Sequence, residues 1–351
     1  MKISKTLLAV AGASTLVVTV AAQKIQIQGA GATFPNPIYQ KWFSEYNKLH
    51  NNIEINYQSL GSGAGIRQVT NQTVFFGATD GPMNNDQLQA APGKILHFPT
   101  VLGADVPIYN LPGVSAELKF TGPVLADIFL GKVTKWNDPE IAKLNPGMNL
   151  PDTDITVVHR SDESGTTFVY TSWLADESAD WNKQVGADTA VSWPTGIGAD
   201  GSDGVAGSLS QTQGSIGYIS YDFAVASNLS VASVQRDDGT FVSPSIDSIS
   251  KAGGGLTFPI KPDTNILNAP TAGAYPITTT TYVLVYTDQT DKAKGQTLVD
   301  FLTWGLTKGQ AEVTKLNYSP LPSKVAKDAL AQLSQVKYQG STIQPSSVVG
   351  S

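Results

Sequence analysis

Hydrophobic and polar positions in the first quarter of the chain follow two different periods. Strands are predicted where apolar and polar residues alternate or β-branched residues gather, at 25–28 (IQIQ), 53–60 (IEINYQSL) and 74–82 (VFFGATDGP). Helices are predicted at 38–50 (IYQKWFSEYNKLH), where apolar side chains recur at helical spacing, and at 66–72 (IRQVTNQ). Strands, glycine-containing loops and helices therefore follow one another in turn, which is the pattern of an α/β fold.

The remainder of the chain continues this alternation. Its predicted strands and helices are a strand-rich stretch at 95–111, a helix at 123–131, a strand, loop and helix over 155–176, a glycine-rich loop leading into a helix over 193–212, a strand at 214–221, a β-branched strand at 276–288 and an amphipathic helix at 295–306. Residues 228–274 are rich in turns and show little periodicity. Trp136, in the segment KWNDPE, is either an exposed partner contact or an aromatic packed in a turn.

Composition narrows the function. The 351 residues are enough for two domains, and a charged fraction of 15% with a hydrophobic fraction of 41% indicates a globular protein. The net charge of −6 argues against a nucleic-acid binder, because a phosphate backbone requires basic patches. The absence of cysteine excludes disulfides, cysteine nucleophiles, cysteine-ligated zinc and a lipid-carrying N-terminal cysteine.

The N-terminus has the form of a secretory signal. Lys2 and Lys5 precede an apolar run that ends in small residues, and cleavage is predicted after Ala22, which makes 1–22 the signal peptide. The run is short for a membrane anchor and contains hydroxyl residues, and no other segment is apolar enough to span a bilayer. Since the signal holds two lysines and no acid, its removal takes the net charge from −6 to −8.

Four loops carry the candidate chemistry: GAGATF (29–34), GSGAG (61–65), FFGATDGP (75–82) and RSDESGTT (160–167). Three of them lie between a predicted strand and a predicted helix, at the carboxyl ends of strands, where ligands of open α/β sheets bind. The free amides and the dipole of a helix N-terminus favour anions, and serine and threonine hydroxyls add donors. These loops therefore predict an anion site.

Each of these loops also has an ordinary structural explanation. GAGATF lacks the ending of a P-loop and could be a tight turn with Thr33 as a helix N-cap. Asp80 could cap the turn at Gly81-Pro82, and Arg160 could form a surface salt bridge with Asp162. On these residues alone, both explanations stay open.

An enzyme needs a base beside a nucleophile. Ser164 has Glu163 and His159 nearby in sequence, but no Gly-x-Ser-x-Gly turn surrounds it. The three histidines show no zinc spacing, so we expect no metal and no cofactor. A phosphatase or serine hydrolase is kept as the lesser hypothesis.

The order of the motifs is more specific than any one of them. GAGATFPNPIYQKW, GSGAG, FGATDGP, IFLGKVTKWNDPEIAKLNPG, HRSDESGTTFVYTSWL, WPTGIG, GSIGYISY and PITTTTYVLV follow one another at a spacing that resembles the phosphate-binding proteins of the high-affinity bacterial phosphate ABC transporter. The resemblance covers about residues 27–325. It implies an α/β, two-lobed periplasmic binding protein of type II, with lobe I at 23–100 and 276–351, lobe II at 101–275 and the ligand in the cleft between them.

The resemblance also implies the site. Its phosphate contacts carry over to residues of both lobes: Thr33, Phe34, Ser62, Asp80, Arg160, Ser164, Gly165 and Thr166, with Asp162 orienting Arg160. The sequence departs from the family at Thr79, where serine is common, and at Glu163, where glycine is common, so we expect the Glu163 side chain to point away from the ligand. We assign no contact to the glycine-rich loop 196–204.

Asp80 is informative because a carboxylate should repel an anion. Hydrogen phosphate carries a proton that a carboxylate can accept, whereas sulfate does not, and sites built around one hydrogen bond can reject analogues that lack it by about 10⁴–10⁵. The implied function is therefore high-affinity phosphate binding in the periplasm and delivery to an ABC-type permease, by a monomer that is not an enzyme and binds no nucleic acid. A receptor for another tetrahedral oxyanion, such as sulfate or molybdate, is the alternative.

Overall fold

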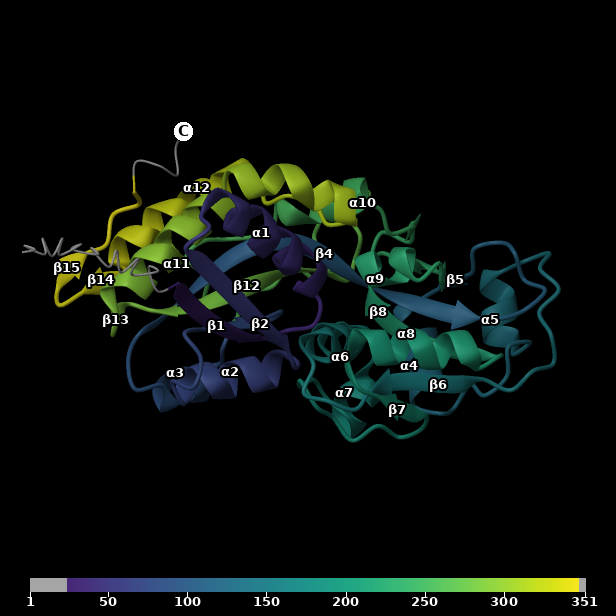
Figure 1. The fold of residues 1–351 in the computed structure, drawn as a ribbon. Coiled ribbons are helices and arrows are strands. Elements are labelled where there is room, and N and C mark those ends of the chain that lie inside the picture. The colour runs from purple at the N-terminus through teal and green to yellow at the C-terminus, as the bar shows by residue number, and fades with distance from the viewer. Residues whose placement is uncertain (1–23, 347–351) are drawn as a thin grey trace, which may run out of the picture.

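The computed structural model describes residues 24–346 (Figure 1). The predicted signal peptide and its cleavage site lie outside the described residues. Within residues 24–346, no helix has the length and apolar content needed to cross a bilayer.

A mixed sheet forms the frame of the molecule. Among the described residues it has nine strands, in the order β2-β1-β3-β12-β4-β8-β6-β7, with β9 added alongside β4. These strands are β1 (Ile25–Gly31), β2 (Ile53–Ser59), β3 (Phe76–Thr79), β4 (Ile95–Asn110), β6 (Thr156–Arg160), β7 (Ile197–Ala199), β8 (Ser215–Ser220), β9 (Ser230–Val231) and β12 (Thr278–Tyr286).

The long strand β4 joins two lobes. Its first part, from Ile95 to Ala104, pairs with β12, and its second part, from Asp105 to Asn110, pairs with β8. Figure 1 shows β1, β2, α1 and α11 gathered around the first part and α4, α6 and α8 around the second. The predicted α/β, two-lobed fold is confirmed. Strand β4 is shared, because one part of it pairs with a strand of each lobe.

Helices cover both lobes. Those before β4 and after β12 are α1 (Asn36–Leu49), α2 (Ser62–Thr70), α3 (Asn85–Ala90), α11 (Lys292–Gly305) and α12 (Ser323–Gln332), with 3₁₀ turns η1 (Lys308–Leu316) and η2 (Leu333–Gln335). Those between β4 and β12 are α4 (Gly122–Phe129), α5 (Pro139–Leu144), α6 (Gly165–Glu177), α7 (Ala179–Gln184), α8 (Gly201–Gln211), α9 (Tyr221–Ala226) and α10 (Ile246–Gly253).

Each lobe has its own aromatic core. The first core forms because α1 turns its apolar face, including Trp42 and Phe43, onto Phe301 and Trp304 of α11. The second core contains Trp136, among other buried aromatics. The second core extends to Leu321, Val325 and Ala329 of the C-terminal segment, so the two lobes are joined by shared packing as well as by β4.

Several predicted features change in the structure. Helix α2 begins at Ser62, inside the segment GSGAG that was predicted as a loop. Trp136 is fully buried and its indole N–H donates to the Gly214 carbonyl at 2.9 Å, so it is the packed aromatic and not an exposed partner contact. The turn-rich segment 228–274 contains α10 and short strands. The remaining short strands among the described residues, outside the nine-stranded sheet, are β5 (Lys119–Phe120), β10 (Ser233–Gln235), β11 (Phe241–Val242), β13 (Asp288–Gln289), β14 (Lys337–Tyr338) and β15 (Ser341–Thr342).

Candidate anion-binding site

The four candidate loops meet between the lobes. A methyl group placed on Gly165, at the start of α6, would lie 2.2 Å from Ser62 Oγ and 2.5 Å from Asp80 Oδ2. The Gly63 amide of α2 donates to the Glu163 carbonyl at 3.0 Å, which is a backbone hydrogen bond between segments about a hundred residues apart. The loops are therefore in direct contact, and the structure is that of closed lobes.

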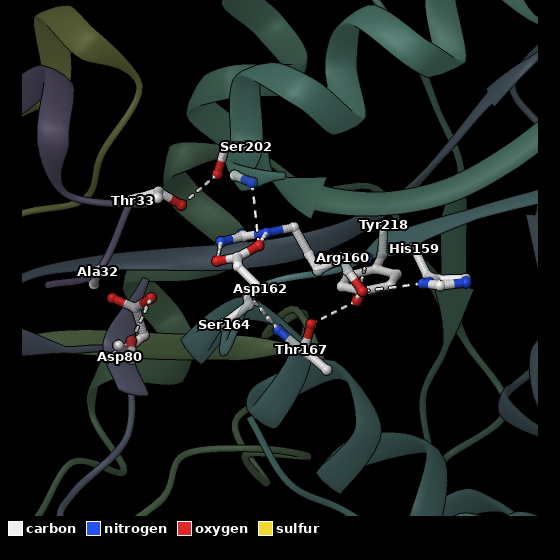
Figure 2. A network of polar contacts seen from close by, with 12 residues as sticks. Ala32, Thr33, Asp80, His159, Arg160, Asp162, Ser164, Thr167, Ser202 and Tyr218 are labelled. Carbon is white, nitrogen blue, oxygen red and sulfur yellow. Dashed lines mark hydrogen bonds and ion pairs between the residues drawn. The ribbon is translucent and has the colours of Figure 1, made fainter. Parts of the chain in front are cut away.

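Arg160 is held at the end of β6. Its side chain is 2% exposed, its Nε donates to Asp162 Oδ1 at 2.6 Å, and its second nitrogen Nη2 pairs with Asp162 Oδ2 (Figure 2). Asp162 Oδ1 also accepts from the Gly201 amide at 3.1 Å. This is a buried, two-point ion pair and not the surface salt bridge considered above, so Asp162 fixes the direction of the guanidinium.

Helix α6 directs its N-terminus into the cleft. Ser164 caps it, because its Oγ accepts from the Thr167 amide at 3.1 Å. The next amides, of Gly165 and Thr166, belong to the first turn, where backbone donors have no partner within the helix. Thr166 Oγ1 is buried and has no hydrogen-bond partner within the described residues. The first turn of α6 thus offers several donors to an anion.

Asp80 follows β3 and is 2% exposed. Its amide donates to Ser62 Oγ at 3.2 Å, and its Oδ2 is 3.5 Å from the same hydroxyl, at the limit of a hydrogen bond. Its Oδ1 has no partner among the described residues. Burial raises the pKa of the Asp80 carboxyl to about 7, with Thr281, Arg160 and Ser62 opposing the rise. An acid here can accept or carry a proton near neutral pH.

The loop before α1 completes the site from the first lobe. Thr33 does not cap α1, because the N-cap position is taken by Pro35, so that alternative is wrong. The Thr33 hydroxyl instead lies 2.8 Å from Ser202 Oγ (Figure 2), and the Phe34 carbonyl lies 2.7 Å from the Tyr318 hydroxyl.

The sequence analysis missed the contribution of α8. Gly201 and Ser202 open this helix and contact Asp162 and Thr33, so α8 supports two site residues, while the expectation that the loop 196–204 makes no contact with the ligand stays a prediction. The signal that could have found them is the strand, glycine-aspartate loop and helix order over 193–212, which is the same order as in the other site loops.

Neither His159 nor Glu163 is directed at Ser164 as a base. The His159 ring stacks on Trp193 with centroids 4.8 Å apart, and the Glu163 carboxylate pairs with Arg67 at the exposed edge of the cleft. The Glu163 side chain therefore lies outward, as expected. Across residues 24–346, no group of three or more His, Cys, Asp or Glu side chains could hold a metal ion.

Comparison with known proteins shows the family of the chain. A family model described as a PBP superfamily domain matches residues 17–306. The chain is 43% identical over 322 residues to the phosphate-binding protein PstS of Pasteurella multocida (strain Pm70), covering 91% of this chain and 92% of that protein. It is 36% identical over 337 residues to the phosphate-binding protein PstS of Methanocaldococcus jannaschii, covering 89% of this chain and 87% of that protein.

Solved structures share the fold. A high-affinity periplasmic phosphate-binding protein (PfluDING) bound with phosphate superposes with a TM-score of 0.71 at 23% identity, covering 91% of this chain and 96% of that chain. The phosphate-binding protein of Stenotrophomonas maltophilia gives a TM-score of 0.68 at 19% identity, with the same coverage of 91% and 96%.

Proposed function

Because the chain belongs to the PBP superfamily and, within it, to the PstS phosphate-binding proteins, we propose that its cleft binds inorganic phosphate with high affinity, as hydrogen phosphate. The protein then delivers the ion to the permease of a phosphate ABC transporter. The observation that carries the proposal is the buried meeting of Arg160, the α6 N-terminus and Asp80 between the lobes.

The donors divide between the lobes. We assign phosphate contacts to eight residues: Thr33, Phe34, Ser62, Asp80, Arg160, Ser164, Gly165 and Thr166. Arg160 supplies the formal positive charge, and Asp162 orients it. Helix N-terminal amides and hydroxyls supply the remaining donors, as is usual for oxyanion sites. Ser202 joins this set as a residue that positions the Thr33 hydroxyl.

Asp80 selects the ligand. Its unpartnered Oδ1 is suited to accept the P–OH hydrogen of hydrogen phosphate. Sulfate has no such hydrogen, so it would place acceptor against acceptor in a buried site, which is unfavourable. A receptor for sulfate or molybdate is therefore the second candidate function, and Asp80 argues against it.

The remaining assignments follow the same proposal. We place lobe I at 23–100 and 276–351 and lobe II at 101–275, which the partner change along β4 after Ala104 and the start of β12 at Thr278 support. The protein acts as a monomer in the periplasm after signal removal, and it is a binding protein and not an enzyme.

Calorimetric titration tests the proposal. The mature chain is unfolded and refolded to strip bound ligand, then titrated with phosphate in excess sulfate. One-to-one binding that sulfate leaves unchanged is the expected result. Binding that sulfate abolishes would make the protein a general oxyanion receptor and Asp80 a turn residue.

A further inference from the structure

A second buried acid stands close to the phosphate loop. Asp222 lies on α9, in the second lobe, and is 4% exposed. Its Oδ2 is 2.7 Å from the hydroxyl of Tyr318, which belongs to the C-terminal part of the first lobe. The same hydroxyl is 2.7 Å from the carbonyl oxygen of Phe34. The three groups form a chain that crosses from one lobe to the other.

Hydrogen counting sets the direction of this chain. The Tyr318 hydroxyl has one hydrogen, and the Phe34 carbonyl can only accept. Both distances of 2.7 Å are those of full O–H···O hydrogen bonds. Both bonds can exist together only if Asp222 is protonated and donates to Tyr318, while Tyr318 donates to Phe34. An ionised Asp222 would compete for the single hydrogen and leave the Phe34 carbonyl facing a hydroxyl oxygen.

The surroundings of Asp222 favour the neutral acid. Its Oδ1 is buried and has no partner within the described residues, and no lysine, arginine or histidine of residues 24–346 forms an ion pair with it. An ionised carboxylate in that position would be strongly disfavoured. Burial raises the pKa of the Asp222 carboxyl to about 7, and this outweighs the opposing effects of Tyr318, of Ser220 and of the backbone amides of Asp222 and Phe223.

The other ionisable groups near α9 do not change this picture. Asp105, on β4, is also buried and interacts electrostatically with three ionisable groups, which are Asp80, Arg160 and Asp222. Burial raises the pKa of the Asp105 carboxyl well above its usual range. Asp105, held in its neutral form by burial, adds no charge beside Asp222, and the positive charge of Arg160 is already paired with Asp162.

We propose that Asp222 is a positioning residue, which in its protonated form fixes the Phe34 segment of the phosphate loop through Tyr318 and so adds to phosphate affinity. The inference rests on the proposed phosphate binding. The sign of its pH dependence follows from the raised pKa. In the folded protein the hydrogen-bonded chain is complete at pH values well below 7 and is lost as the pH rises through about 7, while its contribution to folding stability is fully present below the pKa of an unfolded aspartate.

The test compares the mature chain with D222N, whose amide can donate to Tyr318 but cannot ionise. We expect D222N to bind phosphate within about threefold of the unmodified chain at pH 6 and about tenfold more tightly at pH 8.5, because one buried hydrogen bond is lost only from the unmodified chain. Titration of phosphate and of Asp80 affects both proteins equally. A ratio of the two dissociation constants that stays flat between these pH values would overturn the proposal.

Two further variants separate positioning from folding. D222A should bind about tenfold more weakly than D222N at every pH, since it cannot donate at all. In a Y318F background, D222N should have no pH-dependent effect. A full pH-dependent effect in that background would contradict the route through Tyr318. Circular dichroism verifies that each variant is folded.

A readout without phosphate separates this inference from the proposed function. Carboxyl-carbon NMR of the stripped chain should show two aspartates titrating near pH 7, Asp80 and Asp222, and D222N should lose one of these two titrations and keep the other. If no variant bound phosphate, the proposed function would fail while the Asp222 titration could still be observed. An Asp222 carboxyl already ionised at pH 5 would overturn the inference whatever the binding result.

Discussion

At the scale of single residues, the site combines one cation with one acid that can hold a proton. Arg160 is already paired with Asp162, so the site is not a strong general attractor of anions. In the proposed function, Asp80 then discriminates among the anions that do enter. Selectivity in such a site depends on where one hydrogen lies more than on net charge.

Asp80 should make sulfate competition depend on pH. As the pH falls through about 7, Asp80 becomes protonated and can donate to sulfate, so sulfate affinity should rise roughly thirtyfold between pH 8.5 and 5.5. Competition titrations at the two pH values measure this. The D80N variant can donate to sulfate at any pH, so its sulfate affinity should not show this pH-dependent rise. A D80N variant that still excludes sulfate fully would contradict the role of Asp80.

Arg160 should be required for affinity. Arg160→Ala removes a buried, charged contact and leaves Asp162 without its cation, so we expect phosphate binding to weaken by about 2–5 kcal/mol. Titration calorimetry measures the change, and Arg236→Ala is the control, because the Arg236 guanidinium pairs with Asp238 and donates to the carbonyls of Ala269 and Ala274, which are outside the four site loops. A near-normal dissociation constant for Arg160→Ala would remove Arg160 from the site.

At the scale of elements, the N-terminus of α6 comes close to the first lobe. This close approach is possible because Gly165 has no side chain. Gly165→Ala should keep the lobes apart, since its methyl group would overlap Ser62 Oγ, and should weaken phosphate binding by about 1–3 kcal/mol. Gly207→Ala is the matched control, because a methyl group on Gly207 of α8 has no neighbour within 4 Å. Equal binding by both variants would show that α6 does not seat against Ser62.

The sequence predicted elements better than it predicted their contacts. Alternation and helical spacing located β2, α1 and α11, because those patterns record which faces are buried. Local pattern could not show that α2 starts within GSGAG or that Thr33 contacts Ser202, since both depend on segments brought together by folding. The order of strands, loops and helices located the loops of the site, and the resemblance supplied the individual contact residues, but the role of α8 came only from the structure.

At the scale of the whole molecule, closure is reinforced at the edge of the cleft. Arg67 of α2 pairs with Glu163, which connects the lobes beside the hydrogen bond from Gly63 to the Glu163 carbonyl. The two side chains are 57% and 42% exposed, so the ion pair contributes at most about 1 kcal/mol and is weakened by salt.

Removal of this pair should speed phosphate release. Glu163→Gly should raise the dissociation rate by up to about fivefold at low ionic strength and much less at high ionic strength. Stopped-flow release measurements report it, and the charge reversal R67E combined with E163R is the control that should restore the slower rate. A release rate that Glu163→Gly leaves unchanged at low salt would mean that the ion pair does not hold the lobes together.

The shared strand β4 has a consequence for how the molecule unfolds. Both lobes hydrogen-bond to the same 16-residue strand, so unfolding of either lobe leaves one end of that strand unpaired. The halves should therefore melt together, and differential scanning calorimetry of the stripped chain should give a single transition whose calorimetric and van't Hoff enthalpies agree. The cleft would then open and close for its ligand within a molecule whose two lobes unfold in one cooperative transition.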